Sequence, residues 1–127
     1  EKNQMGKLYS SDFPYFRIKN PEKFIGYLVD EKLKKNWELS IEGDEFALPK
    51  FSKTIEKIDI FHYDSDKSYK GRKNAMNFVK SNINRDTIII FDDIQDNFFF
   101  KDFVKNKKKY NIFCFKNKYI GMVYDNF

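Results

Sequence analysis

The feature that most constrains the fold is a regular alternation of strand-like and helix-like segments along the chain. The clearest strand is residues 87–91, which are β-branched or aromatic and apolar on both faces. Such runs are typical of parallel strands that helices cover on both sides. Residues 69–83 carry Ala75, Met76 and Val79 at helical spacing. Strands and helices in this order predict parallel strands joined by crossover helices.

Ten elements follow from the pattern. Asn20-Pro21-Glu22 is a favourable helix start, because Asn can cap the helix, Pro is favoured at the first helical position and an acid follows. Only Lys116-Asn117-Lys118 separates the last two strands, which is hairpin spacing. We therefore expect an α/β fold: a mostly parallel sheet with helices on its faces and an antiparallel hairpin at one edge. The expected strands are 7–12, 37–41, 58–63, 87–91, 110–115 and 119–124, and the expected helices 20–33, 46–55, 69–83 and 96–109. Within the first of these helices, Asp30-Glu31 can start a second short turn toward Leu33.

Length and composition favour one soluble globular domain over residues 1–127. Hydrophobic residues make up 41% of the chain and charged residues 34%. The net charge of +5 comes from Lys residues interleaved with Asp and Glu, and the one tight basic run, 107–109, follows an expected helix end. The aromatic side chains Phe91, Phe100 and Phe113 fall on expected core positions and are not free to stack on bases. We expect no nucleic-acid partner.

The single cysteine and the absence of long apolar segments indicate the compartment. Cys114 cannot form an intrachain disulfide, which favours a reducing, cytoplasmic location. Its place in the apolar run 112–115 predicts a buried, inert thiol. No signal peptide and no stretch near the ~20 apolar residues that span a bilayer is present, so we expect no membrane association.

Acidic residues follow each of the first four expected strands. They are Asp12, Asp44 after Gly43, Asp64, and the pair Asp92-Asp93. In open parallel sheets, ligands bind outside the carboxyl ends of the strands. Helix capping is an alternative explanation, and for Asp44 it is about equally good. It explains Asp92-Asp93 less well, because one helix cap does not need two carboxylates.

Two of these segments resemble a known family. Residues 58–69, IDIFHYDSDKSY, followed by residues 87–97, TIIIFDDIQDN, are similar to class I S-adenosylmethionine-dependent methyltransferases. The similarity is to the group with a D-x-D-[HK]-S-Y turn after strand four and D-D after strand five. It covers nearly the whole chain, and it implies a Rossmann-like fold and methyl transfer to a small hydroxylated molecule or sugar.

The resemblance also implies roles for the residues at the strand ends. Asp12 would accept hydrogen bonds from the ribose hydroxyls of S-adenosylmethionine, since a carboxylate offers two acceptors to a diol. Gly43 and Asp44 would lie beside the adenine, with Asp44 accepting from its amino group. Asp64 would lie near the methionine part of the cofactor and the reacting methyl group.

In metal-dependent relatives, the acids that match Asp64, Asp92 and Asp93 hold a divalent cation. Ligation by oxygen alone suits Mg²⁺ or a similar hard ion, which would lower the pKa of the acceptor hydroxyl. Where many relatives have His after the second acid of the turn, this chain has Lys67. Lys67 could neutralise neighbouring acids, act as a base if burial lowers its pKa, or simply pair with Asp66. The metal requirement therefore stays open.

The family's glycine-rich cofactor loop is absent from the chain. No two of the five glycines are close enough for a G-x-G loop, which in the family follows a first, central strand. We expect the chain to be the C-terminal part of such a domain, with a missing N-terminal segment or a second chain, as in a homo-oligomer, completing the site. The alternative is a degenerate methyltransferase-like domain that acts as a non-catalytic binding or scaffold module.

Overall fold

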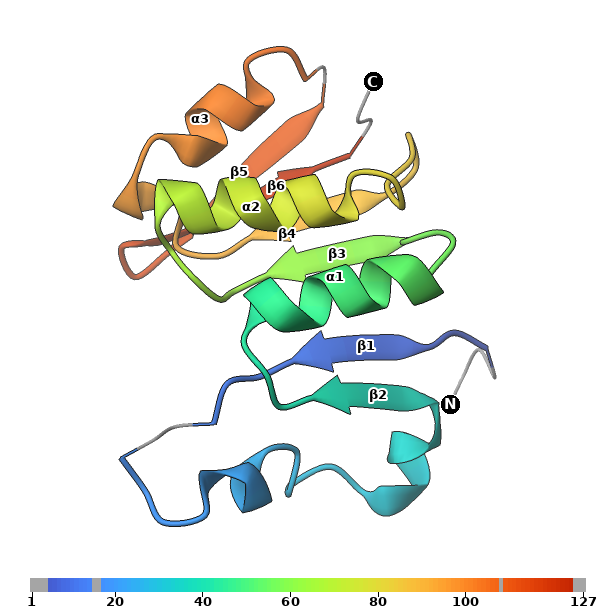
Figure 1. Ribbon diagram of the computed structural model, residues 1–127. Helices are drawn as coiled ribbons and strands as arrows, with labels where there is room; N and C mark the ends of the chain where they lie inside the picture. The colour runs from blue at the N-terminus through green and yellow to red at the C-terminus, as the bar shows by residue number, and fades with distance from the viewer. Residues whose placement is uncertain (1–4, 15–16, 108, 125–127) are drawn as a thin grey trace. The chain divides into compact units, whose positions relative to one another are not determined.

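A computed structural model describes residues 5–14, 17–107 and 109–124 (Figure 1). These residues form a mixed α/β structure, which confirms the predicted fold class at that level. They divide into two compact units, with the boundary between Phe51 and Ser52.

The first unit contains a two-stranded parallel sheet of β1 (Leu8–Ser11) and β2 (Trp37–Ser40). Leu8 pairs with Trp37 and Ser11 with Ser40. The indole Nε1 of Trp37 donates to Ser10 Oγ at 2.7 Å, which ties the two strands together by their side chains as well. Both strands end on the same side, and α1 (Asp44–Thr54) begins shortly after β2 and continues across the unit boundary.

The helix expected from residue 20 is wrong as a continuous helix, whereas the second short turn expected to start at Asp30-Glu31 is present. The structure has two short 3₁₀ helices instead, η1 (Pro21–Phe24) and η2 (Glu31–Asn36). Asn20 before η1 and Gly26 after it both have positive φ, 52° and 67°. A Cβ at Gly26 would lie 2.3 Å from the ring of Trp37, so the chain passes the indole at a position that only glycine fits. This close approach interrupts the helical pattern that the spacing of Phe24, Ile25 and Leu28 predicted.

The second unit contains a four-stranded mixed sheet in the order β3-β4-β6-β5. The strands are β3 (Ile60–Tyr63), β4 (Ile88–Phe91), β5 (Tyr110–Phe115) and β6 (Lys118–Val123). β3 and β4 are parallel and are joined through α2 (Tyr69–Val79), whereas β6 is antiparallel to both β4 and β5. The predicted hairpin therefore lies at one edge of this sheet, as expected. The strands of the chain nevertheless form two sheets and not the one mostly parallel sheet that we predicted.

Phe91 is the centre of the core of the second unit. Its ring is fully buried and lies 5.3 to 6.3 Å, between centroids, from the rings of four neighbours. These are Tyr63 on β3 and Phe99, Phe100 and Phe103 on α3 (Phe99–Val104), which follows η3 (Ile94–Asp96). Four of the fifteen Phe residues, Phe91, Phe99, Phe100 and Phe103, thus pack α3 against the sheet.

Two core predictions on β5 are wrong. Cys114 is exposed, and so are Phe113 and every other residue of β5. β5 is the outermost strand, and the helix expected over 96–109 is much shorter, with α3 ending at Val104. Neither face of the strand is covered among the described residues, so its apolar side chains stay in contact with solvent.

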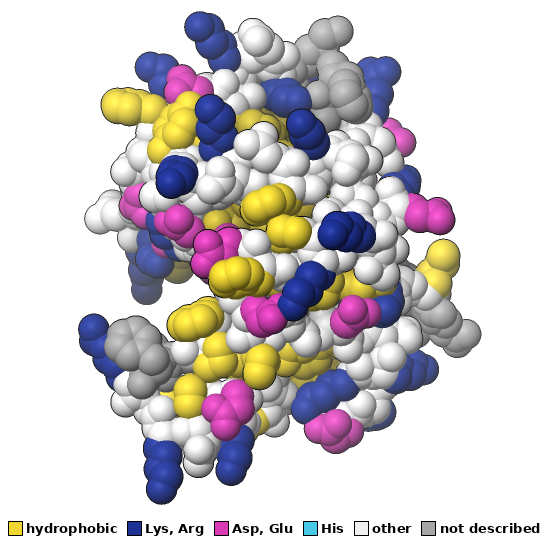
Figure 2. All heavy atoms as spheres, viewed as in Figure 1, with side chains coloured by type: hydrophobic (Ala, Val, Ile, Leu, Met, Phe, Trp, Pro, Cys, Tyr) yellow, Lys and Arg dark blue, Asp and Glu magenta, His cyan; other side chains and the backbone are white. Residues whose placement is uncertain are grey.

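The surface carries both signs of charge. Figure 2 shows Lys and Arg side chains interspersed with Asp and Glu over the face drawn, without one continuous basic area. Within the part of the chain that the structure describes, no helix combines the length and the apolar character needed to cross a bilayer.

Candidate functional site

In the first unit, three predicted cofactor-binding residues lie at the carboxyl ends of the two parallel strands. Asp12 directly follows β1, and its backbone N–H donates to the Ser40 carbonyl oxygen at 3.0 Å. The Gly43 carbonyl oxygen accepts from two amides of the first turn of α1, each at 3.0 Å. Asp44 is the first residue of that helix, where its charge suits the helix dipole. The side chain of Asp12 is exposed to solvent beside this end of the sheet.

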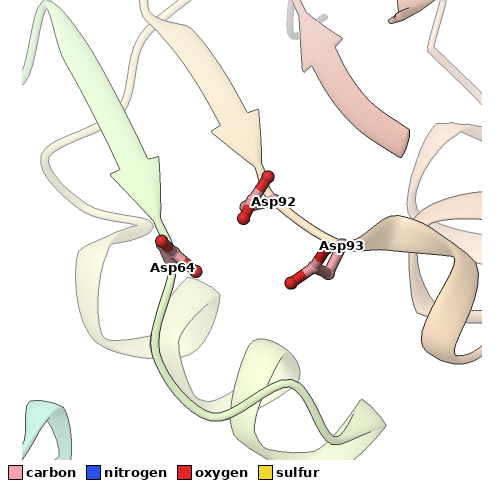
Figure 3. Close-up of side chains that lie close together, drawn as sticks. All are labelled: Asp64, Asp92 and Asp93. Atoms are coloured by element: carbon pink, nitrogen blue, oxygen red, sulfur yellow. The ribbon is translucent and has the colours of Figure 1, made fainter. Parts of the chain in front are cut away.

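In the second unit, three predicted acids form one cluster, named here the acidic cluster: Asp64, Asp92 and Asp93. Asp64 follows β3, and Asp92 and Asp93 follow β4, so the parallel pairing of these strands brings them to one edge. One carboxylate oxygen of each lies within 4.8 Å of the other two. Figure 3 shows the three side chains around a common space at the ends of the two strands.

Lys67 lies among these three carboxylates. Its Nζ contacts Asp64 Oδ1 and lies 3.1 Å from Asp93 Oδ2 and 3.5 Å from Asp92 Oδ2. Burial by itself lowers the pKa of Lys67, but hydrogen bonds to Asp64 and Asp93 outweigh it, and the pKa is raised above its ordinary value. A raised pKa favours the charge-neutralising role among those left open by the sequence and disfavours that of a base.

The turn that carries Lys67 is held by its own polar side chains. Ser68 caps α2 by accepting from the Gly71 amide at 2.9 Å, and Asp66 Oδ1 accepts from the Ser68 amide at 2.9 Å. Asp66 therefore stabilises the turn, and Lys67 pairs with the acidic cluster. The carbonyl oxygen of Lys67 accepts from Asn97 Nδ2 at 2.6 Å. These bonds fix the backbone on both sides of Lys67.

Arg72 is a member of this region that we did not predict. It is completely buried, and its Nη2 donates to the carbonyl oxygens of Asp92 and Asp93, each at 2.9 Å. Its Nε and Nη1 have no hydrogen-bond partner among the described residues. The sequence did contain a signal: Arg72 lies three and seven residues before Ala75 and Val79, on the buried face of α2.

Asp93 has an unusual backbone for a non-glycine residue. Its φ of 48° places it in the left-handed region, where an Asp is tolerated better than most residues. Its Oδ1 accepts from Gln95 Nε2 at 3.3 Å and lies 3.5 Å from Lys118 Nζ. Hydrogen bonds from Lys67 and Gln95 hold the pKa of Asp93 below its usual range. Asp93 is therefore an anion that is bound on both of its oxygens.

The acidic cluster has the right donor atoms for a hard divalent cation, since all its ligand atoms are carboxylate oxygens. The ammonium group of Lys67, however, lies where such an ion would bind. A divalent ion and the Lys67 ammonium group would therefore occupy the same position between the three carboxylates. A separate hollow of about 360 Å³ between α2 and α3 is lined mainly by apolar residues such as Met76, Ile89 and Phe103, and includes none of the predicted site residues.

Comparison with models of known protein families finds no match, and neither does comparison with curated proteins.

Proposed function

We propose that this chain is part of an S-adenosylmethionine-dependent methyltransferase that methylates a hydroxyl group of a small molecule or sugar. The observation that carries the proposal is the gathering of acids at strand ends in both units. Asp12 and Asp44 lie at the ends of β1 and β2, and the acidic cluster lies at the ends of β3 and β4. This is the position where parallel α/β sheets bind ligands.

The hydrogen-bond acceptors at the strand ends of the first unit suit an adenosine group. A solvent-exposed carboxylate such as that of Asp12 can accept two hydrogen bonds from a vicinal diol. Asp44 lies at the end of the neighbouring strand, where its carboxylate can accept from an exocyclic amino group. A Cβ built on Gly43, directly before Asp44, would meet no atom closer than Cδ2 of Phe13 at 4.0 Å, so a flat ring can approach the backbone there.

Considered by itself, the second unit carries groups of the kind that a methyl-transfer step needs. When bound, S-adenosylmethionine supplies a methyl group attached to a positively charged sulfur, and the rest of the cofactor is left as a neutral thioether after the transfer. Asp64, the most exposed acid of the acidic cluster, would orient the acceptor and receive its proton as the oxygen attacks the methyl group. The hydrogen bond from Lys67 lowers the pKa of Asp93 and so keeps this neighbouring acid charged. The residues would act mainly by positioning and electrostatics.

Calorimetric titration of S-adenosylhomocysteine tests the proposal. The protein expressed from its full natural reading frame should bind the ligand, and Asp12→Ala should weaken binding by ~1–3 kcal/mol, the range for losing a charged hydrogen-bond partner. Asp59→Ala is the matched control, because it removes an exposed aspartate that precedes β3 and does not follow the carboxyl end of any strand. No binding by the wild type, or equal losses in both variants, would argue against the proposal.

A further inference from the structure

The acidic cluster already has a cation in contact with all three of its carboxylates. Lys67 Nζ forms ion pairs with Asp64, Asp92 and Asp93, and the longest of them is 3.5 Å. The side chain of Lys67 is 31% exposed, and those of Asp92 and Asp93 are 21% and 16% exposed. The pairs with Asp92 and Asp93 are therefore partly shielded from solvent, whereas the pair with Asp64, which is 50% exposed, lies nearer the surface.

The formal charges around the acidic cluster also balance without an added ion. The three carboxylates contribute three negative charges. Lys67 contributes one positive charge, Lys118 a second at 3.5 Å from Asp93, and Arg72 a third through its bonds to the carbonyl oxygens of Asp92 and Asp93. A divalent ion would add two positive charges to this balanced group and would have to displace the Lys67 ammonium.

We propose that Lys67 is the resident cation of the acidic cluster and that its ammonium group takes the place of a divalent metal ion. An ion that is bound to carboxylate oxygens needs them at about 2.0–2.6 Å. The ammonium group lies in the same space between the carboxylates, so the two cations exclude each other both sterically and by charge. The bond from Asn97 to the Lys67 carbonyl and the Ser68 cap keep the backbone of Lys67 in place.

This arrangement gives the chain a cation that is covalently attached and always present. It differs from a metal site in that it needs no supply of ions and cannot be emptied by a chelator. The inference concerns the acidic cluster alone and does not depend on the proposed function. If that function holds as well, methyl transfer would not respond to EDTA.

Binding of Mn²⁺, followed by electron paramagnetic resonance of the free ion, tests the inference. The wild type should bind Mn²⁺ no more tightly than a weak carboxylate site, with a Kd of roughly 1 mM or above. Lys67→Met, which keeps the length of the side chain but removes its charge, should bind about tenfold more tightly or better. Adding Asp93→Asn to Lys67→Met should abolish that gain.

Lys57→Met is the matched control, because it makes the same change of charge. Lys57 is 53% exposed and pairs with Asp59 ahead of β3, away from the acidic cluster. It should leave Mn²⁺ binding at the wild-type level. A folded Lys67→Met variant without tighter binding would overturn the inference, and so would an equal gain in Lys57→Met.

A measurement on the wild type covers the case in which Lys67→Met does not fold. Paramagnetic broadening of the amide signals of Asp64, Asp92 and Asp93 reports directly on Mn²⁺ at the acidic cluster. Submillimolar Mn²⁺ should leave these three signals unchanged under the inference. Selective loss of all three at that concentration would show that a metal displaces the lysine, and the inference would fail.

Discussion

Gly121 on β6 is the position where the structure makes its sharpest prediction about packing. A Cβ at this residue would lie 2.3 Å from Cε2 and 2.4 Å from Cζ of Phe100, well inside the usual 3.4–4 Å contact range. Phe100 is only 3% exposed and belongs to the aromatic group around Phe91. Its ring must therefore shift by more than an ångström in a packed core if residue 121 gains a side chain. The glycine is explained by this close approach.

Gly121→Ala should destabilise the second unit by about 1–3 kcal/mol, the range for overpacking a core. Amide hydrogen exchange measures this locally, because protection of the β4 amides reports the free energy of opening this sheet. Their protection factors should fall about 5- to 150-fold, since every 1.4 kcal/mol is a factor of ten.

Phe100→Leu provides the control, because it removes the ring atoms that the new Cβ would meet. In that background, Gly121→Ala should cost about 0.5 kcal/mol or less, so the two changes should be strongly non-additive. If Gly121→Ala leaves protection within about twofold of the wild type, or if the two costs simply add, the packing argument at Gly121 is refuted.

Two further predictions concern buried polar and backbone features. Thr87 is fully buried, and its Oγ1 donates to the Ile58 carbonyl oxygen at 2.6 Å and accepts from the Asn84 amide at 3.0 Å. Thr87→Val should destabilise the second unit by about 1–3 kcal/mol, since both partners lose a bond; amide exchange of β3 and β4 checks this, and unchanged protection would contradict it. Gly26→Ala should destabilise the first unit and alter the fluorescence of Trp37, because a Cβ would meet the indole at a φ of 67°; an unchanged emission spectrum would count against the close contact.

The sequence predicted the second unit well because its signals are local. The β-branched run before Phe91 and the compact apolar run at 58–63 each identify a strand, and hairpin spacing identifies the final pair. The convergence of Asp64 with Asp92-Asp93 followed from one rule, that parallel strands end at the same edge. These predictions did not need knowledge of any contact between distant residues.

The failures depend on contacts that no local pattern contains. The segment around Gly26 has helical spacing, but the ring of Trp37 occupies the space that a helix would need. Cys114 lies in an apolar run that looks the same whether or not a layer covers it. The sequence left three roles open for Lys67, because the direction of a flexible side chain depends on where the Asp92-Asp93 turn lies. Arg72 was missed because a charged residue in a Lys-rich helix suggests exposure, although its spacing placed it on the buried face.

The most direct test of the central claim is an NMR titration of the ¹⁵N-labelled protein, expressed from its full natural reading frame, with S-adenosylhomocysteine. The account predicts saturable shifts of the amide signals of Asp12, Gly43 and Asp44, at the strand ends of the first unit, with one common dissociation constant. Signals on the exposed strand β5, such as that of Phe113, should stay in place. Shifts confined to other parts of the chain, or no shifts at millimolar ligand, would contradict the assignment of these strand ends to the cofactor.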